Sequence, residues 1–241
     1  MATRASSRPR SRSRTRSFRP IRFLIKAVIG LILFSVVWVA VYRFVPPPFT
    51  FTMLGDVLSG RSVEKDWMPL SRIDPNMARA AIAGEDAKFC SHHGFDVDAI
   101  GAAMMRNAAG GHIIRGGSTI SQQTAKNTFL WQGGGYFRKG LEAWFTLLIE
   151  AIWGKHRIME VYLNVAETGI GTYGANAGSQ RYFRHDASHM SPVEASRIAA
   201  VLPLPKKRPG VAPTGYTRRY GNAILRRAGV VRREGMDSCL R

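Results

Sequence analysis

The feature that most limits how this chain can fold is an uncharged apolar run near its N-terminus. Residues 21–45 are almost entirely apolar, and residues 27–42 include no charged side chain. A helix of about 20 consecutive apolar residues is long enough to cross a bilayer. Lys26 and Arg43 flank the run, where their charged ends can reach lipid headgroups. We therefore expect residues 21–45 to form an uncleaved transmembrane anchor. A buried core helix is disfavoured because the run has no polar face.

The charge on the two sides of this run predicts its orientation. Residues 1–20 are rich in Arg and Ser, so we expect a disordered tail. Ten Lys and Arg residues precede Asp56, the first acidic residue, and supply about half of the net charge of +19. Positive flanks stay on the cytoplasmic side. Residues 46–241 should then form a periplasmic domain at the inner membrane, still basic enough to favour an acidic substrate or an anionic surface.

Beyond the apolar run, the sequence predicts a mainly α-helical domain. Pro46, Pro47 and Pro48 end the first helix and form a stiff spacer. The apolar stretch Phe49–Leu54 suits either a strand or a surface that dips into the membrane, and we slightly favour the membrane contact. Helix starts or helical periodicity occur at Asp74-Pro75, residues 157–164, the capping box Ser191-Pro192-Val193-Glu194, and an apolar face made by Leu141, Trp144, Phe145, Leu148, Ile149 and Ile152.

Two cysteines, Cys90 and Cys239, are too few for a disulfide framework or a metal cluster. Their spacing neither supports nor excludes one bridge in an exported domain. Two unpaired thiols are the favoured interpretation.

Three stretches are rich in side chains that can do chemistry. Residues 85–96 gather two acids and two histidines beside a glycine turn. Residues 116–127 place two glycines before a polar helix start, which would expose backbone N–H groups to an anion. Residues 138–142 put two cations next to a carboxylate. Each has a simpler interpretation, respectively a solvated helix end, an N-cap and surface ion pairs. His92 and His93 lack the spacing of metal ligands.

Together these stretches resemble the motifs of the family 51 peptidoglycan glycosyltransferases, the polymerase module of bifunctional penicillin-binding proteins. The resemblance covers about residues 65–210. The first motif is matched by Glu85, Asp86, Phe89, His92 and Gly94; the second at every defined position from Gly116 to Asn127; the third by Arg138, Lys139 and Glu142; the fourth by Tyr162, Leu163, Asn164, Gly169, Gly174, Tyr182 and Phe183; and the last by Glu194, Ala199, Ala200, Leu202, Pro203 and Pro205. Nothing resembles a transpeptidase and the chain ends soon after Pro209, so we expect the monofunctional, membrane-anchored branch.

The resemblance implies a lysozyme-like helical fold and a glycosyltransferase that polymerises lipid II, the undecaprenyl-diphosphate-linked disaccharide pentapeptide. Inverting transfer would release undecaprenyl diphosphate. Glu85 would be the base, and Glu142 a second catalytic carboxylate that holds cations or a divalent ion in place. The implied substrate-binding residues are Asp86, His92, Ser118, Thr119, Gln122, Gln123, Lys126, Asn127, Arg138, Lys139 and Asn164. No protein-held metal or other cofactor is expected, although Mg²⁺ or Mn²⁺ could accompany the diphosphate. The expected partners are lipid II, the growing glycan strand, the membrane and cell-wall synthesis proteins, without nucleic acid.

The sequence departs from the family pattern at three places. Some members carry an Arg that contacts the diphosphate where this chain has Gly133, Gly134 and Gly135, so that contact must come from elsewhere or be missing. Ala177-Gly178 and Leu204 replace a usual Ala-Ala and Asn, and we interpret both as packing changes. Two other functions remain open: a glycan-cleaving, lysozyme-like enzyme, and a membrane scaffold whose Arg-rich tail binds nucleic acid.

Overall fold

A computed structural model describes residues 19–108, 110 and 117–241. The chain divides into two units, one up to Trp38 and one from Val39 to Arg241. The tail that the sequence predicts to be disordered lies outside the described residues except for its last two positions, which are helical, and Gly116 also lies outside them. The helices are α1 (Arg19–Phe44), α2 (Phe51–Leu58), α3 (Pro75–Glu85), α4 (Val97–Ala108), α5 (Ile120–Phe129), α6 (Gly135–Ile152), α7 (Gly154–Val165), α8 (Ala175–Phe183), α9 (Pro192–Val201) and α10 (Gly215–Arg233). Short 3-10 turns are η1 (Leu70–Arg72), η2 (Ala187–His189) and η3 (Ser238–Leu240).

Helix α1 carries the apolar run as a single helix. Its segment Pro20–Phe44 has a mean hydropathy of 2.6 and is long and apolar enough to cross a membrane. At 1.5 Å per residue, 25 residues span about 37 Å, against about 30 Å for a hydrocarbon core. The hydroxyl of Ser35 donates to the carbonyl of Ile32 at 2.7 Å, which satisfies a polar group inside an apolar helix.

The last turn of α1 belongs to the second unit and is fastened to the α6–α7 junction. Trp153 Nε1 donates to the carbonyl of Val39 at 2.7 Å. Arg157 Nη2 donates to the carbonyls of Tyr42 and Val45 at 2.8 and 3.0 Å. The bonds from Arg157 satisfy carbonyl groups at the helix end that have no intrahelical donor.

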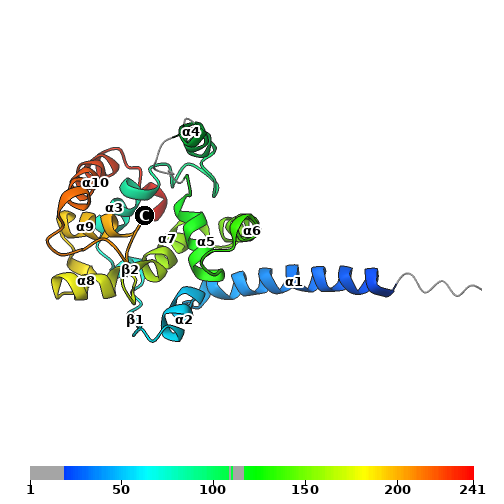
Figure 1. The fold of residues 1–241 in the computed structure, drawn as a ribbon. Helices are drawn as coiled ribbons and strands as arrows, with labels where there is room; N and C mark the ends of the chain where they lie inside the picture. The colour runs from blue at the N-terminus through cyan, green and yellow to red at the C-terminus, as the bar shows by residue number, and fades with distance from the viewer. Residues whose placement is uncertain (1–18, 109, 111–116) are drawn as a thin grey trace, which may run out of the picture. The chain divides into compact units, whose positions relative to one another are not determined.

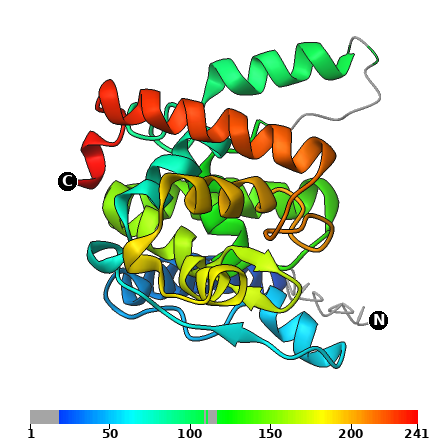
Figure 2. The same ribbon diagram turned by 90° about the vertical axis from the view of Figure 1, so that its left-hand side faces the viewer.

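The second unit is built from two groups of packed helices, seen from two sides in Figures 1 and 2. Helices α3, α9 and α10 pack on one another, and α5 packs on α6 and α7. Gly84 of α3 allows α10 to come close, because a Cβ at Gly84 would lie 3.1 Å from Ile224 Cδ1. The core runs through α7, where every residue from Ile158 to Val165 except Glu160 is buried. The mainly α fold expected from the sequence is confirmed.

A small sheet lies beside these helices. Its strands are β1 (Glu64–Lys65), β2 (Glu167–Gly169) and β3 (Thr172–Tyr173), in the order β1-β3-β2. Strand β1 is parallel to β3, and β2 is antiparallel to β3 with an irregular register. Strand β3, which carries the buried Tyr173, is therefore hydrogen-bonded to a neighbouring strand along each edge.

The stretch Phe49–Leu54, expected to be a strand or a membrane-contacting surface, leads into helix α2. Thr50 caps this helix by accepting a hydrogen bond from the amide of Met53 at 3.3 Å. Phe51, Leu54 and Leu58 recur at helical spacing and are exposed, at 44%, 43% and 78%. The strand interpretation is therefore wrong, whereas the membrane contact stays a prediction that this apolar side supports.

The local helix signals are confirmed. Asp74 caps α3 with Pro75 in its first turn, and Ser191 forms a capping box with Glu194 at the start of α9. Helix α6 includes the predicted face of residues 141–152, but its buried side is rotated. Its buried residues are Glu142, Phe145, Thr146 and Ile149, while Leu141, Trp144, Leu148 and Ile152 are only half-buried.

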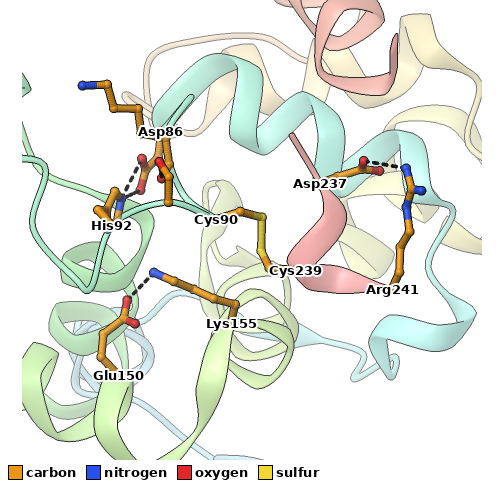
Figure 3. The surroundings of a disulfide bond; sticks show 10 residues. Asp86, Cys90, His92, Glu150, Lys155, Asp237, Cys239 and Arg241 are labelled. Carbon is orange, nitrogen blue, oxygen red and sulfur yellow. Dashed lines mark hydrogen bonds and ion pairs between the residues drawn. A yellow bond between two sulfur atoms is a disulfide. The ribbon is translucent and has the colours of Figure 1, made fainter. Parts of the chain in front are cut away.

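Cys90 and Cys239 form a disulfide across 149 positions of sequence (Figure 3). The favoured interpretation of two unpaired thiols was wrong. Packing of α10 against α3 brings the C-terminal η3 turn to the loop after α3, a juxtaposition that sequence spacing does not reveal. Beside the bridge, Arg79 donates to Asp237 at 2.8 Å and ties α3 to the same C-terminal segment.

Candidate functional site

Glu85, the last residue of α3, lies against α5. Its Oε2 accepts a hydrogen bond from Gln123 Nε2 at 2.8 Å, while Oε1 is buried and has no hydrogen-bond partner among the described residues. Burial raises the pKa of Glu85, and the Gln123 bond and the charges of Arg208 and Lys126 only partly oppose it. A carboxyl group of this kind is suited to taking up a proton, since the protein stabilises its charged form poorly.

Asp86, which follows Glu85 in the chain, forms a hydrogen-bonded pair with His92 (Figure 3). His92 Nδ1 accepts the amide of Gly94 at 3.1 Å, so in the neutral ring Nε2 carries the proton and donates to Asp86 Oδ2 at 2.9 Å. Asp86 Oδ2 also accepts the amide of Ile120, the first residue of α5, at 2.9 Å. The pair therefore holds the loop after α3 against the start of α5.

The start of α5 is less open to an anion than the sequence suggests. Thr119 and Gln122 form a capping box: the amide of Gln122 donates to Thr119 Oγ1, and Gln122 Oε1 accepts the amide of Thr119. With Asp86 on the amide of Ile120, two amides of the first turn already have protein acceptors. Asp86, Thr119 and Gln122 are buried. This geometry gives them a positioning role, and direct substrate contact by them stays a prediction.

The third stretch forms a cluster on the first turns of α6. Glu142 is buried, and it accepts hydrogen bonds from Arg138 Nη1 at 2.7 Å and from Lys139 Nζ. Lys139 also donates to Ser118 Oγ at 3.1 Å. Both carboxylate oxygens accept from cations, so Glu142 holds Arg138 and Lys139 in place. A divalent ion held there stays a prediction.

Lys126 of α5 lies near both Glu85 and the cluster on α6. It lies within electrostatic range of both Glu85 and Glu142. Burial, reinforced by the nearby charges of Arg138 and Lys139 and opposed by Glu142, lowers its pKa. Among the described residues, none accepts a hydrogen bond from Lys126 Nζ. A half-buried ammonium group without an acceptor is a ready site for an anion.

A cavity of about 340 Å³, within the range of small-molecule sites, opens beside Lys126. Gln123 and Asn127 of α5 line one wall. Other lining residues come from the turn after α9 and from the segment around β2 and β3. The lining residues are Thr52, Gln123, Lys126, Asn127, Gln132, Tyr162, Val165, Ala166, Glu167, Tyr173, Leu202, Pro203, Leu204, Pro205, Lys206 and Lys207.

The three glycines at the start of α6 all have positive φ angles, which residues with a side chain rarely adopt. Gly134 is the N-cap of α6 in the left-handed region, with φ +86°. A Cβ there would lie 2.9 Å from both Arg138 Cβ and Trp131 Nε1. A larger side chain at Gly134 would therefore be both strained and crowded.

Asn164 does not line the cavity. Its Oδ1 accepts the amide of Met68, and its Nδ2 donates to the carbonyls of Met68 and Glu160, all at 2.8 Å. The buried amide thus has hydrogen bonds throughout and fastens α7 to the segment before η1. This geometry supports a structural role for Asn164, and direct substrate contact by its side chain stays a prediction.

Sequence reasoning missed several residues near Glu85 and the cavity. The positive charge of Arg208 partly opposes the rise in the pKa of Glu85. Tyr220 OH donates to the carbonyl of Gly84 at 2.8 Å. Burial, with the charge of Glu85, raises the pKa of Tyr220 to about 12. Lys206 and Lys207 line the cavity. The basic run 206–208 directly after the last motif was a signal that could have pointed to them.

Comparison with known proteins places the chain among relatives of one kind. Residues 52–229 match the family described as Transglycosylase. A "Biosynthetic peptidoglycan transglycosylase" of Caulobacter vibrioides is 48% identical over 223 residues, covering 92% of this chain and 97% of the relative. Proteins with the same description from Rhodospirillum centenum and Pseudomonas syringae are 45% and 47% identical, covering 92% and 89% of this chain and 96% and 90% of the relatives.

Proposed function

Since this chain belongs to the biosynthetic peptidoglycan transglycosylases, a family of glycosyltransferases, we propose that it polymerises lipid II into glycan strands by single displacement. The observation that carries this proposal is the place of Lys126. Its side chain lines a cavity, lies within electrostatic range of Glu85 and Glu142, and has no acceptor among the residues that the structure describes. A base and an anion site side by side are what transfer from a sugar diphosphate requires.

In the proposed reaction, Glu85 takes the proton from the 4-hydroxyl of the acceptor sugar. The hydroxyl oxygen attacks the anomeric carbon of the donor, and the bond to the diphosphate oxygen breaks with inversion. The raised pKa of Glu85 supports this role, because a base is most effective when its pKa approaches the working pH. Gln123 orients the carboxylate through Oε2, and no donor in the described part of the chain occupies Oε1.

The departing diphosphate carries the developing negative charge. Lys126 is the proposed direct contact. Arg138 and Lys139, held by Glu142, contribute a positive field to the same region. Cations that are already positioned stabilise the leaving group without reorganising during the reaction.

We propose that α1 anchors the enzyme as a single span, with the tail in the cytoplasm and the second unit in the periplasm. The positive charge before α1 supports this orientation. The disulfide adds independent support, because disulfides persist in oxidising compartments such as the periplasm. The lipid tail of the substrate stays in the same bilayer, so anchoring raises the effective concentration of the substrate.

The test uses purified full-length protein in detergent with labelled lipid II. We expect the wild type to form long strands and Glu85→Gln to form none while it stays folded. Glu234→Gln makes the same chemical change at an exposed position and should be fully active. Polymerisation by Glu85→Gln would exclude Glu85 as the base.

Two further arms separate the alternatives. EDTA during polymerisation measures whether a divalent ion accompanies the diphosphate. Incubation with bare peptidoglycan tests for a glycan-cleaving enzyme, since shortened strands in place of new ones would contradict the proposed polymerase.

A further inference from the structure

The cations on the cavity wall fall into two groups. Lys206 is already occupied: its Nζ donates to Asp56 Oδ1 at 2.8 Å and lies 3.6 Å from Glu167 Oε1. Lys126 and Lys207 line the same cavity, and neither has a hydrogen-bond acceptor or an ion pair in the described part of the chain. Glu167 is the only carboxylate among the described lining residues, so the wall carries an excess of positive charge.

The turn that carries Lys207 is held firmly on both sides. The amides of Lys207 and Arg208 both donate to the carbonyl of Leu204 at 3.0 Å. Arg208 donates to the carbonyl of Ala200 at 2.8 Å, and its guanidinium lies 5.1 Å from the ring centre of Tyr216. The two flanking cations are thus held by the protein, while the side chain between them remains exposed beside the cavity.

The cations of the cluster on α6 do not line the cavity. Arg138 and Lys139 are bound to Glu142, and neither lines the cavity. Lys126 is therefore the one lining cation on the α5 side, within the described residues. A diphosphate carries more negative charge than one lysine can balance, so a second cation on the cavity wall would strengthen its binding beyond the field of Arg138 and Lys139.

We propose that Lys207 is this second cation and that it binds, together with Lys126, the diphosphate of the lipid-linked substrate. The inference rests on the proposed function and adds a binding residue to it. Lys126 is on α5 and Lys207 is on the turn after α9, so the diphosphate would bridge two separate elements of the fold. The proposed anion is a diphosphate ester. A phospholipid headgroup also carries phosphate, so the experiment compares the two anions.

The experiment measures the affinity of full-length protein in detergent for geranylgeranyl diphosphate, with geranylgeraniol as the probe that lacks the anion. We expect Lys207→Ala to weaken diphosphate binding about tenfold, as for loss of one charge-assisted contact, and to leave binding of the alcohol unchanged. Lys207→Arg should retain most of the affinity. Arg218→Ala, which removes an equal charge from an exposed site on α10, should have no effect.

Lys206→Ala provides a contrast, because it leaves the buried carboxylate of Asp56 with one cation fewer and should lower thermal stability, whereas Lys207→Ala should not. Unchanged diphosphate affinity in Lys207→Ala would overturn the inference, as would an equal loss for the alcohol. Weaker binding only to phosphatidylglycerol vesicles would instead assign Lys207 to a lipid headgroup. If the wild type polymerises lipid II in these outcomes, the proposed function stands. If the wild type neither polymerises nor binds the diphosphate, the proposed function itself fails.

Discussion

We expect the disulfide to contribute a large and measurable part of the stability of the second unit. Cys90 lies in the loop that carries Asp86 and His92, and Cys239 lies two residues from the C-terminus. Closing a loop of about 150 residues lowers the entropy of the unfolded chain by an amount worth about 5 kcal/mol at 25 °C. Removal of a native disulfide typically costs about 2–5 kcal/mol, so the entropic value is close to the upper limit.

We expect Cys90→Ser/Cys239→Ser to unfold about 10 °C below the wild type, since about 2–4 °C correspond to each kcal/mol in a domain of this size. The measurement is thermal and urea unfolding of full-length protein in detergent, followed by circular dichroism. Each single serine variant should lose nearly as much stability as the double variant, because either change removes the same bond. Reducing agent should bring the wild type to the same midpoint.

The reasoning would be refuted by an unchanged midpoint in the double variant. It would also be refuted if thiol labelling of the denatured, non-reduced wild type found two free thiols per chain. Polymerase activity after reduction gives a second readout, because the bridge fastens the loop that follows Glu85. An active but less stable double variant would limit the role of the bridge to stability.

The other predictions concern the site and the tail. The kcat/KM for polymerisation should rise with pH through a limb above 4.5, the usual pKa of a glutamate, because the raised pKa of Glu85 keeps the base protonated at lower pH; a limb at or below 4.5 would contradict this. Burial of the charged form costs stability as pH rises above 4.5, so Glu85→Gln should have a higher Tm than the wild type at pH 7, with the difference shrinking at pH 4. Asp86→Ala should lower the free energy of unfolding by about 1–3 kcal/mol, since the amide of Ile120 loses its acceptor, whereas Asp98→Ala, on an exposed pair, should change little. Deletion of residues 2–19 should leave polymerase activity intact, and a tail-dependent activity would favour the scaffold function.

The parts of the fold that were predictable depend on neighbours in sequence. The caps at Asp74, Thr119 and Ser191 are local signals, because each side chain bonds to a backbone group two or three residues ahead. The motifs around Glu85 and Lys126 could likewise be found, since each lies within one short stretch. The structure then placed the two residues within electrostatic range of each other.

The parts that were missed depend on pairs far apart in the sequence. The disulfide joins positions 149 apart, and the side-chain amide of Asn164 hydrogen-bonds to the backbone of Met68, 96 positions away. The buried face of α6 was also missed. Glu142 is buried and paired with two cations from the preceding turn of its own helix, but a hydrophobic pattern ranks a glutamate as exposed. Lys207 gave no signal beyond its charge, since its place depends on how the turn after α9 folds.

Helix α2 joins two environments in eight residues. Its outer side presents Phe51, Leu54 and Leu58, whereas Asp56 on the same helix accepts hydrogen bonds from Lys206 and Tyr173, which both line the cavity. Burial acts to raise the pKa of Asp56, but bonds from Lys206, Tyr173 and Arg61 hold it below its usual value, so the carboxylate remains charged. Asp56 thus links the exposed apolar side of α2 to two residues of the cavity. We therefore expect catalytic rates measured in short-chain detergents and in lipid nanodiscs to differ even at equal substrate occupancy.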